Sequence, residues 1–162
     1  MNRRHFLLGS GAVFALLPVH AMARPAPDTM IVHYDPGCGC CGAWVTHMRD
    51  AGFAVEARAT SQINRIKADL GVPSELASCH TAEIAGYVVE GHVPADAVKR
   101  LLRERPEATG ISVPGMPIGS PGMEVPGMDD DLYKVVLFTG SQAGTFARYR
   151  GVTRIGADEG AR

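Results

Sequence analysis

Hydrophobic and polar positions after residue 28 follow two kinds of spacing. The apolar, β-branched run at residues 29–34 predicts a buried strand, and the alternation of apolar and polar residues at 53–59 predicts a second strand. Between them, apolar residues recur at helical spacing over residues 41–51, and Gly52 is typical of a helix end. This part of the chain is therefore predicted to form a strand, a helix and a strand.

The same patterns predict two more helices and a further strand. Thr60 or Ser61 can cap a helix that ends at Gly71, because the apolar residues between them share one helical face. Residues 85–91 have the composition of a strand followed by a turn. Residues 94–106 predict a third helix, since the proline at its start fits an early helical position.

The last third of the chain begins with a stretch rich in glycine and proline. Residues 109–131 are expected to form a loop, whereas 132–138 and 145–149 flank a turn and predict a β-hairpin. The tail 151–162 is expected to be flexible. The alternation of strands and helices favours a single α/β domain with a central mixed sheet over residues 29–150, and a thioredoxin-like arrangement is the leading candidate.

Length and charge limit the classes of function. A chain of 162 residues is long enough for one domain with a substantial core. Its formal net charge of -1 comes without a basic stripe, which disfavours a nucleic-acid partner. Composition therefore points to a small globular domain whose chemistry depends on particular side chains.

The first residues have the features of an export signal. Arg3 and Arg4 precede an apolar run that is too short and too rich in glycine to cross a membrane, so no stable membrane anchor is expected. Residues 1–23 are predicted to be a twin-arginine signal cleaved after Ala23, with an ordinary secretory signal as the alternative. Residues 24–28 would be a flexible lead. The expected location is the periplasm, which permits disulfides.

The four cysteines carry the most informative pattern. Cys38 and Cys41 have the C-x-x-C spacing of a redox dithiol, at the start of a predicted helix that lowers thiol pKa values. Cys40 adds a third thiol, which would interfere with disulfide exchange but serve as a ligand for a soft metal. Cys79 and His80 precede the third strand, where a thioredoxin-like fold would place them opposite the first three cysteines. A metal site and a redox pair both remain open.

Methionines and other histidines extend the list of candidate ligands. Pro-Gly-Met occurs three times in the glycine-rich loop and supplies the thioethers of Met116, Met123 and Met128. His92 and His47 are weaker candidates, because one lies at a turn and the other on a helix face near the cysteines. Thiolates, thioethers and imidazoles favour Cu(I), with Zn(II) as the second choice. Neighbouring cysteines diverge, so bridging thiolates that hold several Cu(I) ions are expected.

Three classes of function follow from these residues. The first is a copper-binding protein that uses the cysteine cluster. The second is a periplasmic thiol-disulfide oxidoreductase that uses Cys38 and Cys41. The third is an interaction module stabilised by two structural disulfides, which crowding of the cysteines disfavours because each disulfide requires a fixed geometry.

Three segments resemble a known family. The sequences "PGCGCCGAWVTHMRDAGF", "SCHTAEIAGYVVEGHVPADAVKRLL" and "VPGMPIGSPGME" resemble the CopG-type periplasmic copper-resistance proteins, long catalogued as a domain of unknown function. The resemblance implies a thioredoxin-like fold, Cu(I) binding through the four cysteines, and a role in copper handling with other periplasmic proteins as partners. The family's Gly-His-Val-Pro segment matches residues 91–94. A redox conversion of bound copper is also considered for this family, so an enzymatic role stays open.

Overall fold

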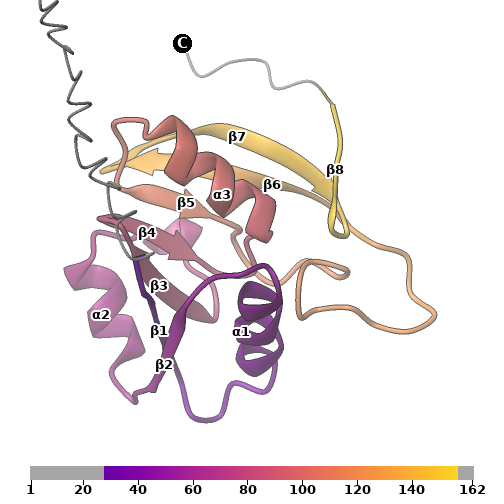
Figure 1. Ribbon diagram of the computed structural model, residues 1–162, viewed down its shortest axis with the longest axis horizontal. Helices are drawn as coiled ribbons and strands as arrows, with labels where there is room; N and C mark the ends of the chain where they lie inside the picture. The colour runs from indigo at the N-terminus through magenta and orange to yellow at the C-terminus, as the bar shows by residue number, and fades with distance from the viewer. Residues whose placement is uncertain (1–27, 157–162) are drawn as a thin grey trace, which may run out of the picture.

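The structure, a computed structural model, describes residues 28–156 (Figure 1). The predicted export signal and all of the flexible lead except Asp28 lie outside these residues, as does the end of the tail. The strands in the described part are β1 (Met30–Tyr34), β2 (Val55–Ala59), β3 (His80–Ile84), β4 (Tyr87–Glu90), β5 (Gly110–Ser112), β6 (Leu132–Thr139), β7 (Gln142–Arg150) and β8 (Thr153–Arg154). The helices are α1 (Cys41–Asp50), α2 (Ile63–Asp69) and α3 (Ala95–Glu104), with a short 3-10 turn η1 (Ser74–Leu76).

All eight strands form one open mixed sheet in the order β2-β1-β3-β4-β5-β6-β7-β8. The pairs β1–β2 and β4–β5 are parallel, because α1 and α3 return the chain to the same end of the sheet. The other neighbours are antiparallel. The β3–β4 connection is a two-residue turn in which Ala85 and Gly86 both have positive φ, as the favoured hairpin turns require.

Helices cover both faces of the sheet (Figure 1). Val89 belongs to the main core, which also contains the buried side chains of α1 and α3. Its neighbour Val88 points to the opposite face and packs with Val72 and Leu76, on the side of α2 and η1. The alternation along β4 thus separates two apolar layers. No helix in residues 28–156 is long and apolar enough to span a membrane.

The predicted α/β class and the mixed sheet are confirmed. Strands β1, β2 and β4, the three helices and the late hairpin also lie where the spacing predicted them, with small shifts at their ends. Strand β3 was not predicted: His80 was expected to precede the third strand, and it is instead the first residue of β3. Thr60 accepts a hydrogen bond from the backbone N–H of Gln62, so the hydroxyl closes the turn before α2 and the helix itself begins at Ile63. Pro94 is the N-cap residue of α3.

Two short strands differ from the expectations. Strand β5 lies inside residues 109–131, which were expected to form a loop throughout, and its three residues are buried between β4 and β6. Strand β8 lies in the expected flexible tail and pairs with the end of β7. Elements of two or three residues are too short to show a periodic pattern, and the neighbouring strands determine them instead.

Candidate metal centre

The first three cysteines lie in the cysteine loop (residues 35–41), which joins β1 to α1. The backbone N–H of Gly37 donates to Asp35 Oδ1 at 2.8 Å, and the N–H of Cys38 donates to the Asp35 carbonyl at 2.9 Å. Helix α1 begins at Cys41, and the carbonyl of Cys40 accepts the N–H of Ala43 at 3.1 Å. Local contacts within a few residues therefore hold the loop at a helix N-terminus, where thiolates are stabilised.

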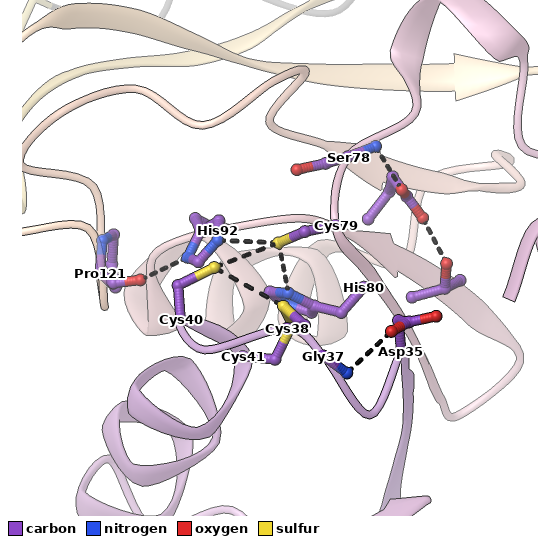
Figure 2. The surroundings of a disulfide bond; sticks show 12 residues. Asp35, Gly37, Cys38, Cys40, Cys41, Ser78, Cys79, His80, His92 and Pro121 are labelled. Atoms are coloured by element: carbon purple, nitrogen blue, oxygen red, sulfur yellow. Dashed lines mark hydrogen bonds between the residues drawn. A yellow bond between two sulfur atoms is a disulfide. The ribbon is translucent and has the colours of Figure 1, made fainter. Parts of the chain in front are cut away.

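The fold brings the fourth cysteine to this loop. Cys38 and Cys41 form a disulfide with a Cα–Cα distance of 5.7 Å, and Cys40 and Cys79 are free thiols (Figure 2). The Sγ atom of Cys40 lies 3.6 Å from that of Cys38 and 3.8 Å from that of Cys79. All four sulfur atoms lie within 4.8 Å of one another. The arrangement has one disulfide and two thiols, in contrast to the two disulfides of the interaction-module alternative.

Two histidines converge on Cys79. His80 Nδ1 lies 3.2 Å and His92 Nε2 lies 3.0 Å from Cys79 Sγ (Figure 2). The Nδ1 atom of His92 is 2.8 Å from the carbonyl oxygen of Pro121 and must donate to it, so its Nε2 carries a lone pair directed at Cys79. Cys79 therefore belongs to a four-sulfur set and to a second set with two imidazoles.

Burial controls the protonation of this second set. Burial and the neighbouring Cys40 raise the pKa of the Cys79 thiol to about 12. Burial lowers the pKa values of His80 and His92, and the neighbouring His92 and Lys67 lower the pKa of His80 further. At neutral pH both imidazoles are therefore uncharged, as a histidine ligand must be. His80 Nε2, which points away from Cys79 across the ring, is buried without a hydrogen-bond partner in residues 28–156.

Trp44 packs against the His80 ring and contacts Val93. Its side chain is fully buried, and its ring lies 4.3 Å, centroid to centroid, from the His80 ring. The indole Nε1–H donates to the carbonyl of Val93 at 2.9 Å. These contacts connect α1 to the segment that carries His92.

The glycine-rich loop packs against the start of α1 at Gly122. A Cβ atom on Gly122 would lie 2.8 Å from the backbone nitrogen of Trp44, so only glycine lets the loop pack on the start of α1. Met123 follows this contact and is half-buried. Met116 and Met128 are each 54% exposed. Met123 is thus anchored beside the first turn of α1, whereas the other two thioethers face solvent.

His47 has a different environment from the other candidate histidines. Its Nε2 accepts the backbone N–H of Ala95 at 3.1 Å, which satisfies a free donor at the start of α3. Among the described residues, the converging Cys and His side chains include all four cysteines, His80 and His92, but His47 is not one of them. The structure therefore assigns His47 a helix-capping contact.

A buried ion pair beside Cys79 was absent from the sequence predictions. Glu90 is fully buried and its Oε1 lies 2.5 Å from Lys67 Nζ, whose residue is only 6% exposed. Thr81 donates to the other Glu90 oxygen at 2.6 Å. The signal available in the sequence was an acidic residue that directly follows the apolar strand residues Tyr-Val-Val, where a carboxylate requires a partner.

The donor set as a whole consists of sulfur and neutral nitrogen atoms. Such ligands suit soft and borderline metal ions. Two of the sulfur atoms are joined in the disulfide, and its reduction by two electrons and two protons supplies all four thiols. The site can therefore hold a disulfide and two thiols, or four thiols that are close enough to share metal ions.

Comparisons with known proteins agree on one family. Residues 76–123, which contain Cys79 and His92, match the family described as "Protein of unknown function, DUF411". No curated protein matches the chain. Two solved structures of copper resistance protein CopG, form 1 and form 2, are each 46% identical to the chain with a TM-score of 0.72. The first covers 78% of this chain and 100% of its own, and the second covers 76% and 99%. The chain therefore belongs to the family of CopG-type copper-resistance proteins.

Proposed function

We propose that this protein binds copper as Cu(I) through Cys38, Cys40, Cys41 and Cys79 in their reduced form. The observation that carries the proposal is the convergence of four sulfur atoms within 4.8 Å of one another in a member of a copper-resistance family. Cu(I) prefers thiolate ligands, and sulfurs this close favour bridging of more than one ion. Zinc is the second choice of metal.

The nitrogen and thioether ligands complete this proposal. His92 has its Nε2 lone pair directed at Cys79, and His80 Nδ1 lies at a similar distance from the same sulfur. Both would extend the cluster beyond the four sulfurs. Met123 is anchored near α1, so it would serve closer to the bound copper than Met116 and Met128, whose exposed thioethers suit capture of incoming ions.

We also propose that the fold is thioredoxin-like and that the protein works in the periplasm. The order β2-β1-β3-β4, with β1 parallel to β2 and antiparallel to β3, supports the fold assignment, as does the cysteine loop between β1 and α1. The export signal predicted over residues 1–23 supports the location. In that compartment the protein would handle copper for resistance, exchanging it with other copper-handling proteins.

The test is an anaerobic Cu(I) titration of the reduced protein, with metal analysis after removal of unbound copper. Wild type is expected to retain Cu(I) in preference to Zn(II). Cys40→Ser and Cys79→Ser are each expected to lose most of it, because each removes a sulfur from the cluster. Ser61→Ala, in the exposed turn before α2, is the matched control. Zinc preference in wild type, or full Cu(I) retention in both cysteine variants, would contradict the proposal.

A second candidate function rests on the disulfide. Cys38 and Cys41 are joined at the N-terminus of α1, which is the arrangement of a thiol-disulfide oxidoreductase. Disulfide reduction of a model substrate separates the two functions. An oxidoreductase loses this activity in Cys38→Ser and keeps it in Cys79→Ser, whereas a copper-binding protein loses metal in both variants.

A further inference from the structure

The ion pair between Lys67 and Glu90 connects three elements beside the metal centre. Lys67 belongs to α2, Thr81 to β3 and Glu90 to the end of β4. Lys67 Nζ donates to Glu90 Oε1 at 2.5 Å and to Thr81 Oγ1 at 2.8 Å, and Thr81 donates to Glu90 Oε2 at 2.6 Å. Burying such a pair costs desolvation energy, and apolar replacements are often equally stable. Stability alone therefore does not account for this pair, and Glu90 has a further contact.

The carboxylate of Glu90 also holds the residue that precedes Cys79. The backbone N–H of Ser78 donates to Glu90 Oε1 at 2.6 Å, a charge-assisted hydrogen bond. The Ser78 hydroxyl donates to the carbonyl of Gly115. A Cβ atom on Gly91 would lie 2.5 Å from Ser78 Cβ, so the Gly91 backbone lies directly against the Ser78 side chain. Ser78 is thus fixed from three sides, next to the Cys79 thiol (Figure 2).

The segment 90–93 contacts both the Cys79 region and helix α1, which follows the cysteine loop. Glu90 holds Ser78 by hydrogen bonding, and His92 contacts the Cys79 thiol at 3.0 Å. Val93 accepts the indole N–H of Trp44, in the first turn of α1. One short stretch of backbone therefore fixes the position of Cys79 relative to the helix that carries the cysteine loop.

We propose that Glu90, fixed by Lys67, is the positioning residue of the metal centre: its carboxylate holds the Ser78 N–H and thereby keeps Cys79 within reach of Cys40. Glu90 contacts no proposed ligand atom, so it acts through the backbone of Ser78. The inference rests on the proposed function where its consequence is measured as Cu(I) affinity. Its geometric part, the accessibility of the Cys79 thiol, does not depend on copper.

Two double variants isolate the Ser78 contact. Lys67→Met/Glu90→Gln removes both charges and keeps an amide oxygen that can accept the Ser78 N–H. Lys67→Met/Glu90→Met has the same loss of charge but no acceptor. The variant with methionine at position 90 is expected to bind Cu(I) at least about tenfold more weakly than the variant with glutamine there. This is the usual effect of losing an outer partner of a metal site. Circular dichroism and thermal melting establish that both are folded.

A second readout reports on Cys79 directly. In the reduced, metal-free protein, iodoacetamide alkylation of each thiol is followed by mass spectrometry of the peptides. Cys79 is expected to react several-fold faster in Lys67→Met/Glu90→Met than in Lys67→Met/Glu90→Gln, whereas the rate at Cys40 stays the same. A general loosening of the fold would raise both rates together, so this comparison separates positioning from stability.

The outcomes are distinguishable. Equal Cu(I) affinity and equal Cys79 alkylation in the two folded variants would overturn the positioning role. If wild type itself retains no Cu(I), the proposed function fails, and the alkylation rates still decide the positioning role. If neither double variant folds, Glu90→Asp replaces them: it keeps the charge beside Lys67 but withdraws the carboxylate by one methylene. Its Cys79 thiol is then expected to react faster than in wild type, and an unchanged rate would overturn the role.

Discussion

The two parts of the metal centre are held in different ways. The cysteine loop is shaped by contacts between near neighbours in the chain, such as the hydrogen bonds from Gly37 and Cys38 to Asp35. The Cys79 segment (residues 78–80) is held by residues more distant in sequence, above all Glu90 and Gly91. Three sulfurs therefore stay together whenever the loop and α1 form, whereas the fourth joins them only when the sheet is correctly assembled.

This difference makes the Cys40–Cys79 separation the sensitive distance of the site. The two Sγ atoms are 3.8 Å apart across the two parts. A displacement of the Cys79 segment changes this distance, while the distances within the cysteine loop stay fixed by local geometry. Variants that disturb one part and spare the other therefore test whether the fourth sulfur is required for copper binding.

The largest effect is expected from Gly91→Ala compared with Gly39→Ala. Gly91 has φ of +73°, and an added Cβ would meet Ser78 Cβ at 2.5 Å and the Val113 carbonyl at 2.6 Å. At Gly39, in the cysteine loop, an added Cβ meets nothing within 4 Å. Gly91→Ala is expected to lower the free energy of unfolding by about 3 kcal/mol through backbone strain and overpacking.

Chemical denaturation and Cu(I) titration measure the consequences of both variants. Gly39→Ala is expected to change stability by less than about 0.5 kcal/mol, as substitutions at open positions usually do, and to keep its copper. Similar stability and copper retention in the two variants would contradict the distinction between the two parts of the site.

The same difference explains which features the sequence could predict. The helical spacing over residues 41–51 is a local signal, and it located the first cysteines at the start of α1. The position of Cys79 opposite the loop followed from the expected fold. The Lys67–Glu90 ion pair was not predicted, because its residues are separated by 23 positions and neither belongs to a local motif.

Backbone acceptors were beyond prediction for a related reason. The carbonyls of Pro121 and Val93 orient His92 and Trp44, yet every residue has a carbonyl and only the folded chain determines which one is reached. His47 shows the converse. Its place on the face of α1 suggested a ligand, but the start of α3 lies close enough to use its imidazole as an acceptor.

An intermediate effect is expected from Trp44→Phe, which acts where the two parts meet. Phenylalanine keeps an aromatic ring beneath His80 but removes the N–H that Val93 accepts at 2.9 Å. A buried carbonyl without its donor lowers the free energy of unfolding by about 1–3 kcal/mol. The reduced variant is also expected to bind Cu(I) more weakly than wild type, because α1 and the segment 90–93 lose a direct connection.

Tyr133→Phe is the control for this variant, since it also removes one buried hydrogen bond from an aromatic side chain. The Tyr133 hydroxyl donates to the Gly151 carbonyl, which connects β6 to the turn after β7. Tyr133→Phe is expected to lose a similar amount of stability with no change in Cu(I) affinity. Equal loss of copper affinity in the two variants would show that stability, and not the connection between the two parts, controls binding.

The smallest effect is expected from His47, which contacts the start of α3 behind the site. His47→Ala removes the acceptor of the Ala95 N–H and is expected to lower the free energy of unfolding by about 1 kcal/mol at pH 8, as loss of a helix cap does. Burial lowers the pKa of His47 below 6.5 in the folded protein. The unfolded chain therefore binds more protons as the pH falls below about 6.5, and wild type loses stability there.

The difference in free energy of unfolding between wild type and His47→Ala is accordingly present above pH 6.5. It shrinks on acidification, because protonation removes the same acceptor that the substitution removes. Urea denaturation of both proteins at pH 8, 6.5 and 5 measures this difference. Both proteins contain His80 and His92, whose pKa values burial also lowers, so the contributions of these two residues cancel in the difference. Copper retention at pH 8 is expected to be the same in both proteins, because His47 lies outside the converging set. A stability difference that grows toward pH 5 would mean that the imidazole is held in its charged form, and the assigned helix-capping contact would then be wrong.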